Sequence, residues 1–246
     1  MVEFSIAGAF SSDPRRPLIA DFGLVPATGL LAHYRFATAD TMLLDSSGNG
    51  AHATIDPAAP NVSYMQNCVR LDGGNPNGRL ILPIMRAAGG RNPNVFTALF
   101  VFKSDTDALS YFATDPDGAG INMYRAGTRA GFRYVPPDDL AQGKTGEGTN
   151  VTGKTFDQFV TYALAGDGTR IYLSSDGAAW GGGTAIDAAG VYPPKATSPI
   201  YTGDMFSKTS GLLGEAVFYD RKLSDLELRG YHAYAKRRMA EKGHYL

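Results

Sequence analysis

The stretch that decides the fold is the end of the chain, residues 211–246: GLLGEAVFYDRKLSDLELRGYHAYAKRRMAEKGHYL. In it, Leu213, Glu215, Val217 and Tyr219 alternate with smaller or apolar residues, which is the period-2 pattern of a β-strand. The polar residues 220–222 that follow are typical of a turn. The stretch therefore predicts a strand that ends in a turn just before a second element.

That second element has the start and stop signals of a helix. Ser224 can cap the free amides of a first turn, and Glu227 three residues later completes a capping box. Leu223 stands just before the cap, where a hydrophobic staple begins, and Gly243 is placed to end the helix. One apolar face recurs at i, i+3, i+7 and i+11: Leu228, Tyr231, Ala235 and Met239.

The segment GEAVFYDRKLSDLEL, residues 214–228, resembles the closing segment of laminin G-like domains of the concanavalin A-like lectin/glucanase superfamily. In that family a last strand with an acidic residue and a Tyr runs into R-x-L-S-x-x-E and a short helix. Residues 29–54 resemble the family's opening segment, a strand followed by the turn DSSGNG at residues 45–50. The resemblance covers residues 29–246 and implies a sandwich of two sheets.

The residues between these two ends supply further strands. Residues 95–103, VFTALFVFK, are apolar on both faces and predict a central strand. Gly166-Asp167-Gly168 predicts the turn of a hairpin. Residues 69–83 form two strand-like pieces around a Gly/Asn-rich turn, and residues 198–202 form a short strand. Residues 136–151 and 181–199 are expected to be long loops.

The predicted fold is all-β: a two-sheet antiparallel jelly-roll sandwich with a C-terminal helix and an extended N-terminal arm. We assign residues 1–29 to the arm and residues 30–246 to the sandwich domain. Pro14, Pro17 and Pro26 keep the arm from forming a long helix or a central strand. Two hypotheses remain for the arm: it covers the edge of its own domain, or it docks on a neighbouring subunit or larger assembly.

The composition of the chain limits the classes of partner and cellular environment that we expect for it. The net charge of -1 argues against a general nucleic-acid binder, which would be clearly basic. No apolar run is long enough for a membrane span, and the first residues lack the features of a secretory signal. The single cysteine, Cys68, excludes an internal disulfide and is expected to be a small core residue.

The sequence predicts no enzyme. Glycan hydrolases of the superfamily carry two carboxyl groups on one strand, and such a pair must flank the scissile bond. None of the five glutamates, Glu3, Glu147, Glu215, Glu227 and Glu241, has such a partner. Glu215 is expected to be a hydrogen-bonded core acceptor. The four histidines accompany neither a nucleophile motif nor a zinc-site spacing.

Acidic loops offer candidate sites for a hard cation. Asp105 and Asp107, and likewise Asp115 and Asp117, each place two carboxylates on one tight loop, which suits calcium. Calcium is thus the candidate cation, and no other cofactor is expected. Asp45 has two interpretations: a metal or sugar ligand, or an aspartate that holds its own turn.

Aromatic side chains on loops are the usual platforms for sugars in such folds. The expected exposed candidates are Trp180, Tyr192, Tyr201 and Tyr124. Trp180 precedes three glycines, and it either caps the end of the sandwich or serves as a sugar platform.

Three functions are compatible with these residues. The first is a non-enzymatic adhesion or glycan-binding module, displayed on a larger assembly such as a bacteriophage virion. The second is a purely structural decoration or tail component that binds protein. The third is a glycan hydrolase. The first two functions imply a homo-oligomer that contacts other virion proteins through the arm. They also imply assembly in a bacterial cytoplasm, with an extracellular or cell-surface location as the alternative.

Overall fold

The computed structural model describes residues 25–74, 77–84, 90–92, 94–107, 110–114, 120–135, 146–185, 200–202 and 210–246. These residues form two antiparallel sheets and one α-helix, α1 (Asp225–Glu241). In spatial order the first sheet contains β13 (Thr184–Ala185), β12 (Arg170–Ser175), β11 (Val160–Asp167), β6 (Val95–Ser104), β15 (Gly211–Tyr219), β4 (Cys68–Leu71) and β3 (Val62–Met65), and β1 (Leu30–Tyr34) also pairs with β15. The second sheet contains β10 (Gly146–Val151), β9 (Arg129–Val135), β8 (Gly120–Ala126), β7 (Ser110–Thr114), β14 (Ile200–Thr202), β5 (Gly78–Leu82) and β2 (Thr54–Pro60).

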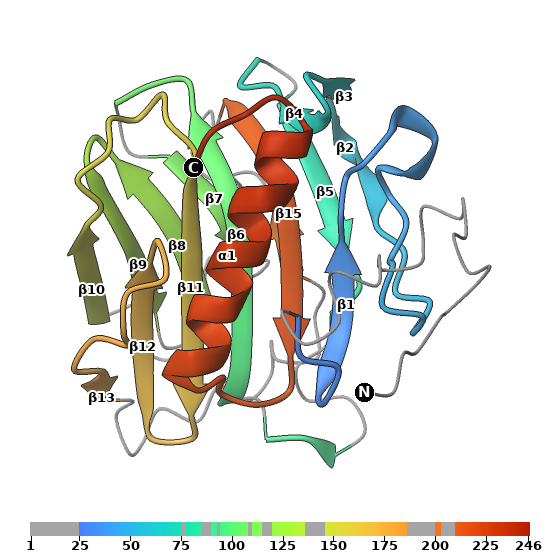
Figure 1. Ribbon diagram of the computed structural model, residues 1–246. Helices are drawn as coiled ribbons and strands as arrows, with labels where there is room; N and C mark the ends of the chain where they lie inside the picture. Colours follow the sequence, from blue (N-terminus) through green and yellow to red (C-terminus); the bar gives the residue numbers. More distant parts are fainter. Residues whose placement is uncertain are drawn as a thin grey trace, which may run out of the picture.

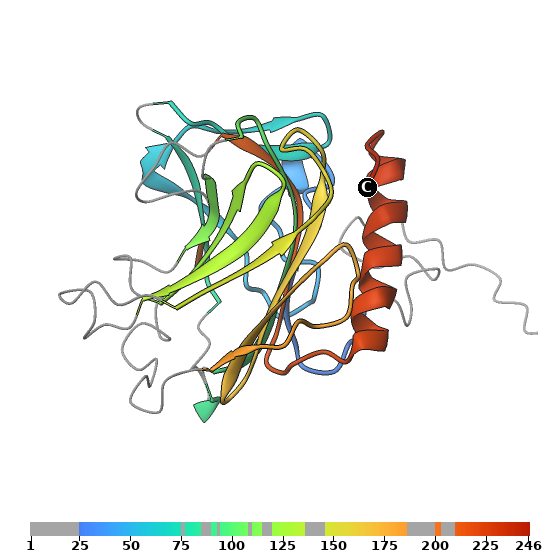
Figure 2. The same ribbon diagram turned by 90° about the vertical axis from the view of Figure 1, so that its left-hand side faces the viewer.

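The two sheets face each other, and α1 lies on the outer face of the first sheet (Figures 1 and 2). This arrangement confirms the predicted all-β sandwich with a C-terminal helix. The arm lies almost wholly outside the described residues, which begin at residue 25, so its role stays a prediction. Among the described helices, none combines the length and the apolar character that crossing a bilayer requires.

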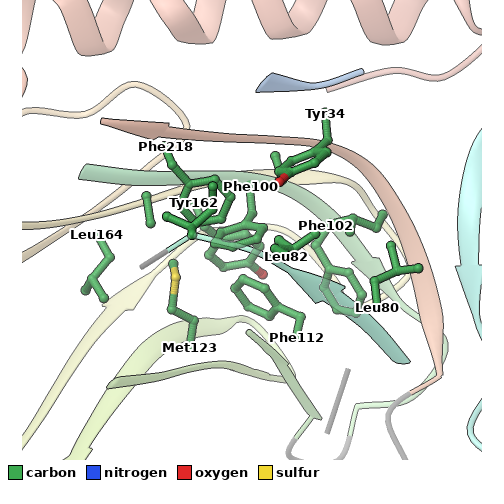
Figure 3. Close-up of a cluster of buried hydrophobic side chains, with 14 of the residues drawn as sticks. Tyr34, Leu80, Leu82, Phe100, Phe102, Phe112, Met123, Tyr162, Leu164 and Phe218 are labelled. Atoms are coloured by element: carbon green, nitrogen blue, oxygen red, sulfur yellow. The ribbon is translucent and has the colours of Figure 1, made fainter. Parts of the chain in front are cut away.

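The main core fills the space between the sheets. Phe100 is at its centre, with its ring edge-on to Phe112 at 5.6 Å and to Phe218 at 5.4 Å (Figure 3). A second apolar cluster lies between the first sheet and α1. Strand β6 contributes to both: Phe100 and Phe102 face the main core, and Leu99 and Val101 face α1. This confirms the prediction of a central strand with two apolar faces.

The closing strand β15 departs from the predicted alternation. Its pairing with β6 shifts register between Leu213 and Glu215, so that Gly214 forms a β-bulge. Leu213 consequently faces the main core, whereas Val217 and Tyr219 face α1. The expected alternation from residue 213 to residue 219 was therefore wrong at one position. The signal was present, because a glycine inside a strand pattern often marks a bulge.

Both predicted long loops contain a strand. Residues 136–151 end in β10, which pairs with β9 along its whole length, and residues 181–199 include β13, which pairs with β12. The two strand-like pieces within residues 69–83 are confirmed as β4 and β5, which belong to different sheets. The hairpin around Gly168 is confirmed, since β11 and β12 pair from Gly166 and Ile171 onward.

Both ends of α1 are formed as the sequence predicts. The Glu227 amide donates to Ser224 Oγ at 3.3 Å, and the Ser224 amide donates to the Glu227 carboxylate at 2.8 Å, which completes the capping box. At the other end, Gly243 has a φ of 86°, and the amides of Gly243 and His244 donate to the carbonyls of Ala240 and Met239. This is the Schellman arrangement that glycine favours.

We expect Ser224→Ala to lower the free energy of unfolding by about 1 kcal/mol, because it leaves a first-turn amide without its acceptor. Urea denaturation of the wild type and the variant would measure the difference. Ser224→Asp is the matched control, since aspartate caps as well as serine and should keep the stability. Equal losses in both variants would contradict a capping role.

Candidate ligand-binding site

A group of buried polar side chains lies beneath α1, around Glu215. Glu215 is 1% exposed, and its carboxylate is bonded to His33 Nε2, which lies 3.4 Å from the Tyr234 hydroxyl. Burial alone would raise the pKa of the Glu215 carboxyl, but the hydrogen bond and charge of His33, with Lys242, hold that pKa below its ordinary value. The prediction that Glu215 is a core acceptor is confirmed. Substrate cannot reach this carboxylate without displacing α1.

Lys242 completes this buried group from the C-terminal end of α1. It is 9% exposed, and its Nζ donates to the carbonyls of Gly214 at 2.6 Å and Arg35 at 2.7 Å. The Gly214 carbonyl belongs to the bulge, and Arg35 precedes Phe36, a buried residue with a φ of 46°. Lys242 thus holds two irregular backbone segments together. No sequence signal identified this role, because a lysine near a helix end is usually solvated.

Trp180 lies at the start of α1, where it covers the apolar cluster under the helix. Its indole N–H donates to the Leu223 carbonyl at 2.8 Å, and its amide donates to Asp225 Oδ1 at 3.2 Å. The ammonium of Lys222 lies 5.9 Å from the indole ring and 3.7 Å from the ring of Tyr172. These contacts are those of a cap. A second role of Trp180 as a sugar platform stays a prediction.

The other aromatic candidates divide between buried and undescribed positions. Tyr124 is 8% exposed and its ring lies on Gly131, where a Cβ would come within 2.4 Å of it. The expectation that Tyr124 is exposed was therefore wrong, because a cross-strand glycine leaves room for the ring to lie flat. Tyr201 is on β14, where only its backbone is described, and Tyr192 lies outside the described residues.

The aspartate pairs form no cation site in the described part of the chain. Asp105 is 2.6 Å from Arg70 Nη1 and accepts from Ser210 Oγ at 2.5 Å, and Asp107 is exposed. Asp115 and Asp117 lie outside the described residues. Within the residues described, no three His, Cys, Asp or Glu side chains are grouped as metal ligands. Calcium binding stays a prediction.

Asp45 holds its own turn, as one of its two interpretations predicted. Its Oδ1 accepts from the amides of His33 and Ser47, both at 2.9 Å, and its Oδ2 accepts from the Ala51 amide at 3.1 Å.

Cys68 is fully buried, and burial raises the pKa of its thiol to about 11, which is typical of an inert core cysteine.

A polar cluster beside α1 was not predicted from the sequence. His232 Nδ1 is 2.8 Å from Thr161 Oγ1, and the Asp176 carboxylate accepts from the Thr161 amide at 3.2 Å. Lys154 Nζ lies 3.1 Å from the same carboxylate. Thr161 and His232 also border a small packing gap between β11, β12 and α1, and most of the residues around this gap are buried. The one signal in the sequence was the Ser-Asp-Gly turn at the end of β12.

This cluster lacks the geometry of a catalytic triad. Asp176 bonds to Thr161 and does not orient His232, whereas a triad needs the acid on the far nitrogen of the histidine. Thr161 is only 4% exposed, so its hydroxyl is not presented to a substrate. The contacts of this cluster instead join α1 to β11 and to the loop before it.

No protein-family model matches the sequence, and no curated protein matches it. Solved structures do resemble the fold. They include the binding domain of botulinum neurotoxin DC in complex with rat synaptotagmin II, with a TM-score of 0.65 and 9% sequence identity, where the likeness covers 84% of this chain and 52% of that one. The binding domain of botulinum neurotoxin serotype D gives a TM-score of 0.63 at 10% identity, covering 85% and 52%.

These likenesses establish a shared fold with toxin binding domains, and the chain spans about half the length of each. The finer assignment to the laminin G-like family stays a prediction.

Proposed function

We propose that this protein is a non-enzymatic binding module for a glycan. The observation that carries the proposal is the likeness, over 84% of the chain, to the solved binding domain of a neurotoxin. Folds host many functions, so the likeness supports a binding role and leaves the ligand to be found by experiment.

The buried position of Glu215 supports the non-enzymatic part of the proposal. Glu215 is the only glutamate on the strand that resembles the family's closing strand, and it is sealed beneath α1 and bonded to His33. A glycosidase needs two carboxyl groups on either side of an accessible bond. The carboxylate of Glu227, the next glutamate along the chain, accepts hydrogen bonds from the Arg221 guanidinium and from the Ser224 amide of the helix cap.

A panel of neutral and acidic polysaccharides, including β-glucan, alginate and bacterial capsule, would test both parts. Biolayer interferometry should detect binding to at least one of them, and a reducing-sugar assay should detect no product from any. A panel without a single bound polysaccharide would overturn the glycan-binding role and favour the alternative, a structural component that binds protein. Turnover that is lost in a folded Glu215→Gln variant would establish the hydrolase instead.

The place where the module works is also a proposal. We favour a bacteriophage virion assembled in the bacterial cytoplasm, with the N-terminal arm contacting other subunits, over an extracellular or cell-surface location. The single, buried cysteine supports folding without disulfides, as in a reducing compartment.

A further inference from the structure

One side of α1 carries a row of basic side chains. Arg229, His232 and Lys236 recur at i, i+3 and i+7, which places them on one face of the helix. Arg229 and Lys236 are exposed, and within the described residues neither forms an ion pair with a carboxylate. From residue 229 to the C-terminus the chain contains Arg229, Lys236, Arg237, Arg238 and Lys242 against the single acid Glu241.

Lys154, from the loop before β11, lies near the His232 imidazole. Burial lowers the pKa of His232; Asp176 opposes that shift, and Lys154 and Lys236 add to it. We call Arg229, His232 and Lys236 the basic strip. Asp176 is the acid that faces the strip, and Lys154, 3.1 Å from that carboxylate, offsets its negative charge.

The exposed surface of α1 around the strip suits a hydrophilic polymer. Among the exposed helix residues next to the cations are Ala233 and Ala240, which are small. The large exposed apolar side chain of α1, Leu226, is in its first turn, away from Lys236. A surface helix that enters a membrane needs bulky apolar groups beside its cations, so a lipid surface fits poorly.

We propose that the basic strip binds a polysaccharide that carries carboxylate or phosphate groups. Arg229 and Lys236 are about 10 Å apart along the helix axis, so they can meet successive acidic groups of one extended chain. The proposal rests on the glycan-binding role proposed above and names the class of glycan. Because the protein as a whole has a net charge of -1, attraction to a polyanion must come from such a local patch.

The test compares alginate, a uronate polymer, with neutral dextran of equal length, using the full chain and biolayer interferometry. We expect binding to alginate and little to dextran, with affinity for alginate falling between about 50 and 200 mM salt. The double variant Arg229→Glu/Lys236→Glu should lose about tenfold or more in affinity. Arg129→Glu is the matched control, because Arg129 is an exposed arginine on β9 of the second sheet; it should bind alginate like the wild type.

Acidification supplies a second readout. The pKa of His232 lies below the ordinary histidine pKa of about 6.5. The imidazole therefore gains its proton only when the pH falls below that ordinary pKa. Affinity for alginate should then rise in the wild type, and His232→Gln should remove the rise while both proteins keep their circular dichroism spectra.

The outcomes separate this inference from the proposed function. Equal binding of dextran and alginate, or a double variant that binds alginate like the wild type, would overturn the basic strip and leave the binding module intact. Binding to vesicles of anionic lipid without binding to alginate would also overturn it, in favour of a membrane surface. Failure to bind any polysaccharide of the larger panel would overturn both.

Discussion

Phe100→Ala is expected to lower the free energy of unfolding by about 3–5 kcal/mol. Phe100 is 1% exposed in the middle of β6, a strand that contributes to both apolar clusters. Its ring meets Phe112 from the second sheet and Phe218 from β15, so the substitution removes contacts with two strands at once. The cavity cannot collapse easily, because the strands on both sides of β6 are themselves fixed by ladder hydrogen bonds.

The measurement is equilibrium unfolding in urea, with the free energy obtained by linear extrapolation. Tyr245→Ala is the matched control, since it also truncates an aromatic ring but at a side chain that is 88% exposed. We expect the control to change stability by less than about 0.5 kcal/mol. A loss below about 1 kcal/mol for Phe100→Ala would show that β6 is not central to the core.

Lys242→Met is expected to cost about 3 kcal/mol. Methionine fills much of the same space but cannot donate, so the carbonyls of Gly214 and Arg35 lose their partner in a buried place. The substitution also removes a positive charge at the C-terminal end of α1 that favours the ionised form of the buried Glu215. The loss should therefore exceed that of an ordinary lysine on a helix.

Lys236→Met tests this comparison within the same helix. Lys236 is exposed and its removal should change the free energy of unfolding by less than about 0.5 kcal/mol. Similar small losses in both variants would mean that Lys242 is not part of the buried group. Loss of helical circular dichroism before the main transition, seen only in Lys242→Met, would show that Lys242 fastens α1 to the sheet.

The buried group and the basic strip divide the polar residues around α1 into two roles. Glu215, His33 and Lys242 are on the inner side of the helix, where burial makes them structural. Arg229 and Lys236 are on the outer side, where they are exposed to a ligand. The experiments proposed for the two sets therefore have different readouts, stability for the first and affinity for the second.

The sequence by itself determined the features that depend on neighbouring residues along one element. Ser224 and Glu227 are three positions apart, so their capping box follows from helix geometry alone. The two apolar faces of β6, the β11–β12 hairpin and the turn held by Asp45 are local in the same sense. These patterns were enough to predict the strands and the C-terminal helix, and the resemblance of the two end segments to laminin G-like domains implied the sandwich that the strands form.

Only the tertiary structure decided which of these elements meet. Lys242 bonds to a carbonyl 207 positions away, and no local pattern records that contact. Tyr124 is buried because Gly131, on the neighbouring strand, has no side chain. The bulge at Gly214 turns Glu215 toward α1, and His232 joins Lys154 only because α1 packs against β11. The charges beside the helix act on one another because packing brings separate segments of the chain close together, and no local pattern in the sequence reveals that packing.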